Sequence, residues 1–258
     1  MGDEVPEYLA HPIWLAHMIE GIISQEPEGE ELLKCFPRDI ATLAAFGLDI
    51  PIISQPNLSV RNAQKFFCAL EGKKVPEGES LVQDRRLYGL LHIGPPSNLI
   101  LFDSNIPSDL ANYVIAHEIG HFVADVMIVQ QHWLHSFSMH PLAIKKFFSW
   151  QCHDEWLEVQ GLLKGLPERP HHIMERGRNE LSETGRREWL ADLIARELLS
   201  PWQIIAPHFR QHGPQNFCSL LQKHYGLPYW VAEEYVDVLQ QTFFPRHDLV
   251  SRLFGPLL

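Results

Sequence analysis

The stretch AHEIGH, at residues 116–121, constrains the fold of this chain more than any other part of the sequence. His117 and His121 are four positions apart, so on a helix their side chains project next to each other, one turn apart. Glu118 points to a neighbouring part of the same helix surface. This is the H-E-x-x-H pattern, in which two imidazoles bind zinc and the glutamate handles protons on the water beside the metal. Such a match also arises by chance in roughly a few per cent of chains this long, so its context must decide.

The residues around this pattern predict that it lies on a long helix. Ser108 and Asp109 provide a helix-capping signal, and apolar residues at helical spacing continue from there beyond His121. Two apolar runs that come before it, at 87–94 and 97–104, flank a short proline turn and predict a β-hairpin. The pattern is therefore in the structural setting that a metal-binding helix needs.

Periodicity and composition predict the remaining elements. A β-branched run at 49–54 predicts one further strand. Apolar residues at helical spacing predict helices at 11–23, 38–48, 60–73, 186–201, 214–225 and 228–243. These elements predict an α+β fold, in which a small, mostly antiparallel sheet packs on a helical body. No repeat, low-complexity segment or Gly/Ser-rich linker divides the chain, so we expect a single domain over residues 1–258.

A catalytic zinc ion usually takes three protein ligands and a water, so another His, Glu or Asp must come from elsewhere. An extension to H-E-x-x-H-x-x-G-x-x-H fails, because Ala124 and Met127 stand at the required positions. The other standard solution is a glutamate on a later helix, and Glu188 and Asp192 in EWLAD share one helix face. In that pattern the first acid binds the metal. The second accepts a hydrogen bond from the free ring nitrogen of a ligand histidine.

The residues alone leave other assignments open. Glu188 and Asp192 could instead lie on a solvated outer face. The third ligand could come from His153, Asp154 or Glu155, although neighbours on a helix point apart. Asp125 could be a partner of a ligand histidine, Tyr113 a core or cleft residue, and Trp189 a packing residue. His171 and His172 fall in a proline-bounded loop, either at the surface or beside the site. The donor to a developing oxyanion could be Tyr88, His92, His172 or Tyr229.

The two metal-helix segments together resemble the ImmA/IrrE family of metallopeptidases. VIAHEIGHFVA is followed by EWLADLIARELLSP, and the family shows an H-E-x-x-H helix and then a helix of the form E-x-x-A-[ND]-x-x-A-x-x-L-L-x-P. The positions in register with this second pattern are Glu188, Ala191, Asp192, Ala195, Leu198, Leu199 and Pro201. The strands before the metal helix and a helix–turn–helix-like tail are also similar. The resemblance covers roughly residues 40–126 and 186–240.

The resemblance implies a zinc endopeptidase. In it, Zn²⁺ is held by His117, His121 and Glu188, while Glu118 is the proton-transferring base and Asp192 orients a ligand histidine. In several members the substrate is a helix–turn–helix transcriptional repressor, which is cut to release stress-response or mobile-element genes. The alternative is a regulatory binding module that retains the zincin fold and acts without catalysis, or acts only when a partner activates it.

One departure from the family separates the two metal helices. His121 and Glu188 are 67 positions apart, whereas many members have a few tens of residues between the two motifs. Residues 128–184 are rich in aromatic and histidine residues, and we interpret them as an insertion. This segment follows an N-terminal part with helices and the small sheet (1–110), and it precedes a C-terminal helical tail (202–258). Substrate preference therefore cannot be carried over from the resemblance.

Charge and cysteine usage restrict the partners and the compartment. The 21 Lys and Arg residues against 32 Asp and Glu give a net charge of −11, which argues against general affinity for nucleic acid. The four cysteines form no C-x-x-C pair, and we interpret them as buried small hydrophobes in a reducing compartment. The N-terminal residues lack a secretory signal, and no apolar stretch reaches the roughly 18 residues of a membrane span. We therefore expect a cytoplasmic protein that contacts neither a membrane nor nucleic acid directly.

Overall fold

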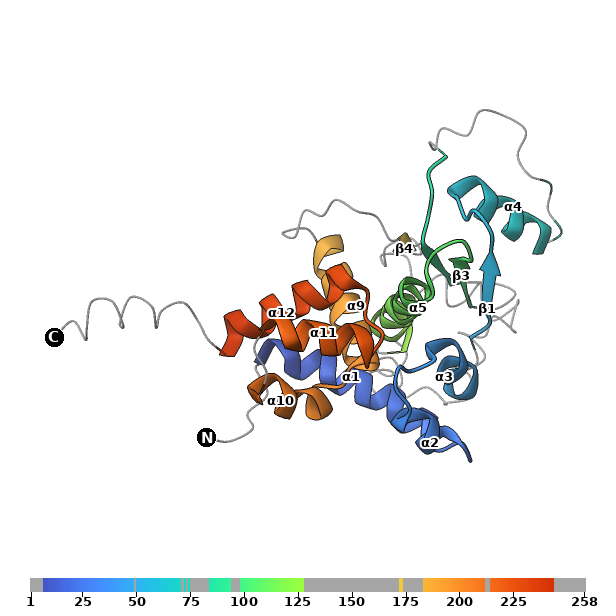
Figure 1. Cartoon of the computed structure of the whole chain (residues 1–258). Helices are drawn as coiled ribbons and strands as arrows, with labels where there is room; N and C mark the ends of the chain where they lie inside the picture. The colour runs from blue at the N-terminus through green and yellow to red at the C-terminus, as the bar shows by residue number, and fades with distance from the viewer. Residues whose placement is uncertain are drawn as a thin grey trace.

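The computed structural model describes residues 7–48, 50–70, 72, 74, 84–93, 98–127, 172–173, 183–211 and 214–243. These residues form a mostly helical structure with one small sheet (Figure 1), which confirms the expected α+β class at this level. The sheet and one covering helix lie at one end of the structure, and the other helices gather beside them. Most of the expected insertion, residues 128–171 and 174–182, lies outside the described residues.

The structure confirms the helices that periodicity predicts, with shifted boundaries. They are α1 (Glu7–Ile23), α3 (Ile40–Gly47), α4 (Val60–Leu70), α5 (Ser108–Phe122), α9 (Glu183–Leu199), α11 (Pro214–Lys223) and α12 (Tyr229–Phe243). Two further helices lie outside the individual helices that periodicity predicts: α2 (Gly29–Lys34), and α10 (Trp202–Gln211) within the expected helical tail. The metal helix does not simply continue, because α5 passes into a π-helical segment, Val123–Met127. Among the described helices, none is long and apolar enough to cross a membrane.

The sheet has the strand order β1-β3-β2-β4. The expected hairpin is present, because β2 (Gly89–His92) and β3 (Leu99–Asp103) pair antiparallel. The short strand β4 (His172–Ile173) also pairs antiparallel with β2. However, β1 (Ile52–Gln55) runs parallel to β3, so the sheet is mixed.

Burial on both faces explains why the hairpin strands are apolar throughout. Successive side chains of a strand point to opposite faces. Leu91 and Ile100 belong to the large core, which also contains residues of α5 and α9. Leu90 and Leu101 belong to a smaller cluster that includes Ala63 of α4. The sheet is therefore covered on one face by α5, which carries His117 and His121, and on the other by α4.

The contact between α5 and α9 is the most extensive of any two elements in the described part of the chain. A glycine allows the two backbones to approach closely. A Cβ atom at Gly120 would lie 2.8 Å from the carbonyl oxygen of Ala191 and 2.9 Å from its Cα. Real Cβ atoms do not make contacts this short, so any side chain at position 120 would force the helices apart. This approach sets the distance across which residues of α5 and α9 can meet.

The cysteines differ from the expectation that they are buried. Cys35 is exposed, and Cys68 and Cys218 are partly buried; all three are free thiols. Cys35 follows the short surface helix α2, where its Sγ lies 3.4 Å from the carbonyl oxygen of Glu31. Position at a helix end, rather than hydrophobicity, therefore decides its exposure. Cys152 lies outside the described residues.

Candidate metal centre

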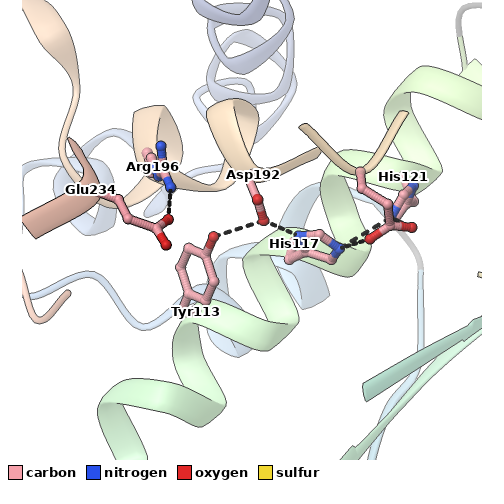
Figure 2. Close-up of polar contacts among 7 residues, drawn as sticks. Tyr113, His117, His121, Asp192, Arg196 and Glu234 are labelled. Atoms are coloured by element: carbon pink, nitrogen blue, oxygen red, sulfur yellow. Dashed lines mark hydrogen bonds and ion pairs between the residues drawn. The ribbon is translucent and has the colours of Figure 1, made fainter. Parts of the chain in front are cut away.

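Two histidines of α5 and one glutamate of α9 meet at a single point (Figure 2). The Nε2 atoms of His117 and His121 are 3.1 Å apart. The two carboxylate oxygens of Glu188 each lie 3.4 Å from one of these nitrogens, Oε2 from His117 and Oε1 from His121. All three residues are buried, and their ligand atoms lie within 4.8 Å of one another.

These separations fit a shared metal ion. Zinc binds imidazole nitrogen and carboxylate oxygen at about 2.0–2.1 Å, which places two ligands of a tetrahedral site about 3.3 Å apart. The observed distances of 3.1 and 3.4 Å lie on either side of that value. Two imidazoles and a carboxylate form a donor set found in hydrolytic zinc sites, and other divalent transition metals also accept it. The cluster is therefore a buried site that could bind a metal ion.

Helix geometry explains how Glu188 reaches the two histidines. Ala191 of α9 packs on Gly120 of α5, and Glu188 and Asp192 lie on the same face of α9 as Ala191. Both acids therefore face α5, and their exposed fractions are only 7% and 3%. The alternative in which Glu188 and Asp192 lie on a solvated outer face is wrong.

Asp192 contacts Nδ1 of His117 (Figure 2), whereas Glu188 lies by Nε2 of the same ring. The Oδ1 atom of Asp192 lies 2.7 Å from Nδ1 of His117. The same oxygen accepts a hydrogen bond of 2.8 Å from the hydroxyl of Tyr113. When Nδ1 of His117 donates to Asp192, the lone pair of Nε2 is directed toward the ligand cluster. The sequence does not predict this hydroxyl contact. Helical spacing alone makes Tyr113, four positions before His117, only a candidate core or cleft residue.

Glu118 is fully buried where α5 packs on β2. A Cβ atom at Gly89 would lie 3.0 Å from Oε1 of Glu118 and 2.4 Å from Cγ1 of Val114. The glycine therefore leaves the space that the carboxylate occupies beside the ligand helix. Sequence reasoning missed Gly89, although a glycine inside a strand signals a close approach of another group.

The charges of the cluster are strongly coupled. Burial lowers the pKa of His117, but contacts with Asp192, Glu188 and Glu118 outweigh it and raise this pKa to about 10. Burial raises the pKa of Glu188, but contacts with His117 and His121 outweigh it and lower this pKa to about 2. The acids around His117 thus favour a cation at this position, either a proton on the imidazole or a metal ion beside it.

The structure places other sequence candidates in other contacts. The ring of His92 stacks on Phe67 with a centroid distance of 4.3 Å. The hydroxyl of Tyr229 is hydrogen bonded to Glu233 of the same helix, and Trp189 is partly exposed on α9. Tyr88 is partly buried just before β2. The candidates outside the described part of the chain are the side chains of Asp125 and His172 and the whole residues His153, Asp154, Glu155 and His171.

Comparison with known proteins adds no relative to this geometry. No protein-family model, curated protein or solved structure matches the chain. The resemblance of the two helices to the ImmA/IrrE family therefore stays a hypothesis drawn from their motifs, and the function must be argued from the site itself.

Proposed function

We propose that this chain is a zinc-dependent endopeptidase. The observation that carries the proposal is the convergence of His117, His121 and Glu188, with the buried carboxylate of Glu118 in the same helical turn. A structural zinc site is closed by four protein ligands and needs no such carboxylate. The described residues offer three ligands and a fourth acidic group, which is the arrangement that metal-assisted hydrolysis requires.

Each residue has one role in the proposed reaction. Bound zinc would supply a Lewis acid that polarises the peptide carbonyl and lowers the pKa of water to about 7. Glu118 takes the proton of the attacking water and delivers it to the leaving amine. Asp192 holds the Nδ1–H of His117 so that Nε2 faces the site. Burial of these groups excludes bulk water and so strengthens every electrostatic interaction among them.

The resemblance to the ImmA/IrrE family supports this assignment and suggests the substrate class. Glu188 and Asp192, the two acids of the family's second motif, both face the histidine helix. Since several members of that family cut helix–turn–helix repressors, we propose a regulatory protein of this kind as the substrate. The proposal places the reaction in the cytoplasm.

The test compares the full-length, zinc-loaded chain with its Glu118→Gln variant on a library of peptides from a digested cellular proteome. New peptide termini are counted by mass spectrometry, and bound zinc is measured by elemental analysis. Glutamine keeps the size of the side chain and removes the base. We therefore expect zinc to remain at about one ion per chain while cleavage falls by about 10²–10⁴-fold.

The matched control is Glu26→Gln, which neutralises an exposed glutamate after α1 and should cleave like the parent chain. Two results would overturn the proposal: a chain that takes up no zinc when zinc is supplied, or equal cleavage by the parent and Glu118→Gln. If neither the parent nor Glu118→Gln cleaves any peptide, the non-catalytic binding module is favoured.

A further inference from the structure

The hydroxyl of Tyr113 contacts a carboxylate oxygen of Asp192 that also contacts a ligand histidine (Figure 2). Tyr113 lies one helical turn before His117 and is fully buried. Its hydroxyl donates to Oδ1 of Asp192 at 2.8 Å, and Nδ1 of His117 lies 2.7 Å from that same oxygen. A hydroxyl and an imidazole on one face of α5 therefore contact the same atom of α9.

Packing fixes the direction of this hydroxyl. The ring of Tyr113 meets the ring of Trp230 of α12 edge to face, with centroids 5.6 Å apart and an interplanar angle of 85°. A phenol ring has only two side-chain torsions, so a ring held by its neighbours presents its hydroxyl at one position. Asp192 thus receives a donor whose place is set by the core and not by solvent.

We infer that Tyr113 is a positioning residue of the metal centre. Its hydroxyl holds Oδ1 of Asp192 in the place where this oxygen accepts the Nδ1–H of His117, and so directs Nε2 of His117 at the metal. Groups that orient a ligand histidine commonly change metal affinity when they are removed. The inference rests on the metal site of the proposed function, but it does not depend on peptide cleavage.

A purely structural role for the hydroxyl makes a different prediction. A buried hydrogen bond stabilises the fold wherever it lies, so its loss would lower the melting temperature and leave zinc affinity unchanged. A positioning role requires that zinc affinity itself falls. It also requires that the effect passes through Asp192, whose Oδ1 accepts the hydrogen bond of the hydroxyl and contacts Nδ1 of His117.

The experiment measures the zinc affinity of the full-length chain and of its Tyr113→Phe variant by competition with a chromophoric chelator. Phenylalanine keeps the ring against Trp230 and removes only the hydroxyl. We expect zinc affinity to fall on the order of 10-fold. In an Asp192→Asn background the same substitution should have a smaller effect, because the two changes act on one hydrogen-bonded pair.

The matched control is Tyr225→Phe, which removes the hydroxyl of another buried tyrosine, one that packs on Phe36. Its zinc affinity should equal that of the parent chain. The inference is overturned if Tyr113→Phe binds zinc normally, if it loses no more affinity than Tyr225→Phe, or if it does not fold. A parent chain that binds zinc but cuts no peptide would overturn the proposed peptidase and leave this inference standing, whereas one that binds no zinc would overturn both.

Discussion

At the scale of single residues, Glu197 is a buried acid outside the metal cluster. Its Oε1 atom accepts a hydrogen bond of 2.8 Å from the backbone N–H of Trp202, at the junction of α9 and α10. Burial raises the pKa of Glu197 to about 8, with a further contribution from Glu20, although the Trp202 N–H and Arg38 act in the opposite direction. The folded chain therefore keeps this carboxyl protonated at neutral pH.

This pKa predicts that stability falls as pH rises. In the unfolded chain Glu197 ionises near its ordinary pKa of 4.5, whereas in the folded chain it ionises near 8. Between these values the folded state binds more protons, so the free energy of unfolding decreases with pH, by at most about 1.4 kcal/mol per unit. Glu197→Gln keeps an oxygen acceptor for Trp202 and should remove this dependence.

Urea unfolding at pH 5, 7 and 9 tests the prediction. The difference in unfolding free energy between Glu197→Gln and the parent should grow in favour of the variant as pH increases, reaching a few kcal/mol. Glu28→Gln, which changes an exposed glutamate, should show no such trend. A constant difference across the three pH values would mean that Glu197 does not titrate in this range.

Sequence reasoning identified the residues that meet in the cluster but not the contacts that organise them. Spacing within one helix places His117 beside His121, and this needs only local information. The hydroxyl contact of Tyr113 depends on a residue 79 positions away, Asp192, and therefore on how α9 packs against α5. The same holds for Gly89, whose neighbour Glu118 comes from another element.

At the scale of elements, the approach of α5 to α9 at Gly120 sets the geometry of the metal cluster. We predict that Gly120→Ala lowers the free energy of unfolding by about 1–3 kcal/mol, since its Cβ would overlap the backbone of Ala191. Zinc affinity should fall as well, because Glu188 moves away from the histidines as the helices separate. Urea unfolding and chelator competition measure the two effects.

The control is Gly21→Ala in α1, where a Cβ atom would meet nothing within 4 Å. In a helix interior this change should stabilise the chain by up to about 1 kcal/mol and leave zinc affinity unchanged. Normal zinc affinity in Gly120→Ala would show that the close approach of α5 and α9 does not determine the position of Glu188.

The two unexpected helices show where periodicity was insufficient. In α10, the buried residues Trp202, Ile205, Ala206 and Phe209 do follow helical spacing. However, Pro207 lies inside this helix and Pro201 precedes it. Prolines at such positions predict the end of a helix, so the sequence did not predict a helix here. α2 has only six residues, too few for a periodic pattern to emerge.

Of the C-terminal helices α11 and α12, α12 presents acidic residues to solvent. Glu233, Glu234 and Asp237 of α12 are exposed. A nucleic-acid backbone would be repelled by such a face, because binding of phosphates needs lysine or arginine there. This distribution agrees with our expectation that the chain makes no direct contact with nucleic acid, which stays a prediction.

At the scale of the whole molecule, the parallel pairing of β1 with β3 was beyond what the sequence could predict. Ile52 pairs with Ile100, and between them the chain passes through α4 and then β2. Local composition predicts that a segment is extended, but the choice of neighbour depends on which faces α4 and α5 cover. The α+β class could therefore be predicted, and the mixed strand order could not.

Zinc removal should destabilise the whole fold. The proposed ligands connect α5 and α9, two helices of the large core, so zinc binds the folded chain and not the separated helices. Mass action predicts a gain of about 4 kcal/mol when free zinc is 1,000 times its dissociation constant. The melting temperature should rise with buffered free zinc and fall after chelation. In His117→Ala, which lacks one proposed ligand, the melting temperature should not depend on zinc. The same independence in the parent chain would contradict this coupling.

The crowding around Gly89 also limits how this chain can change over generations. A Cβ atom at position 89 would lie only 2.4 Å from Cγ1 of Val114, in the same helix as Glu118. A descendant that replaced Glu118 by a smaller residue would still meet Val114. A lineage that had lost the acidic group would therefore keep the glycine as a trace of it.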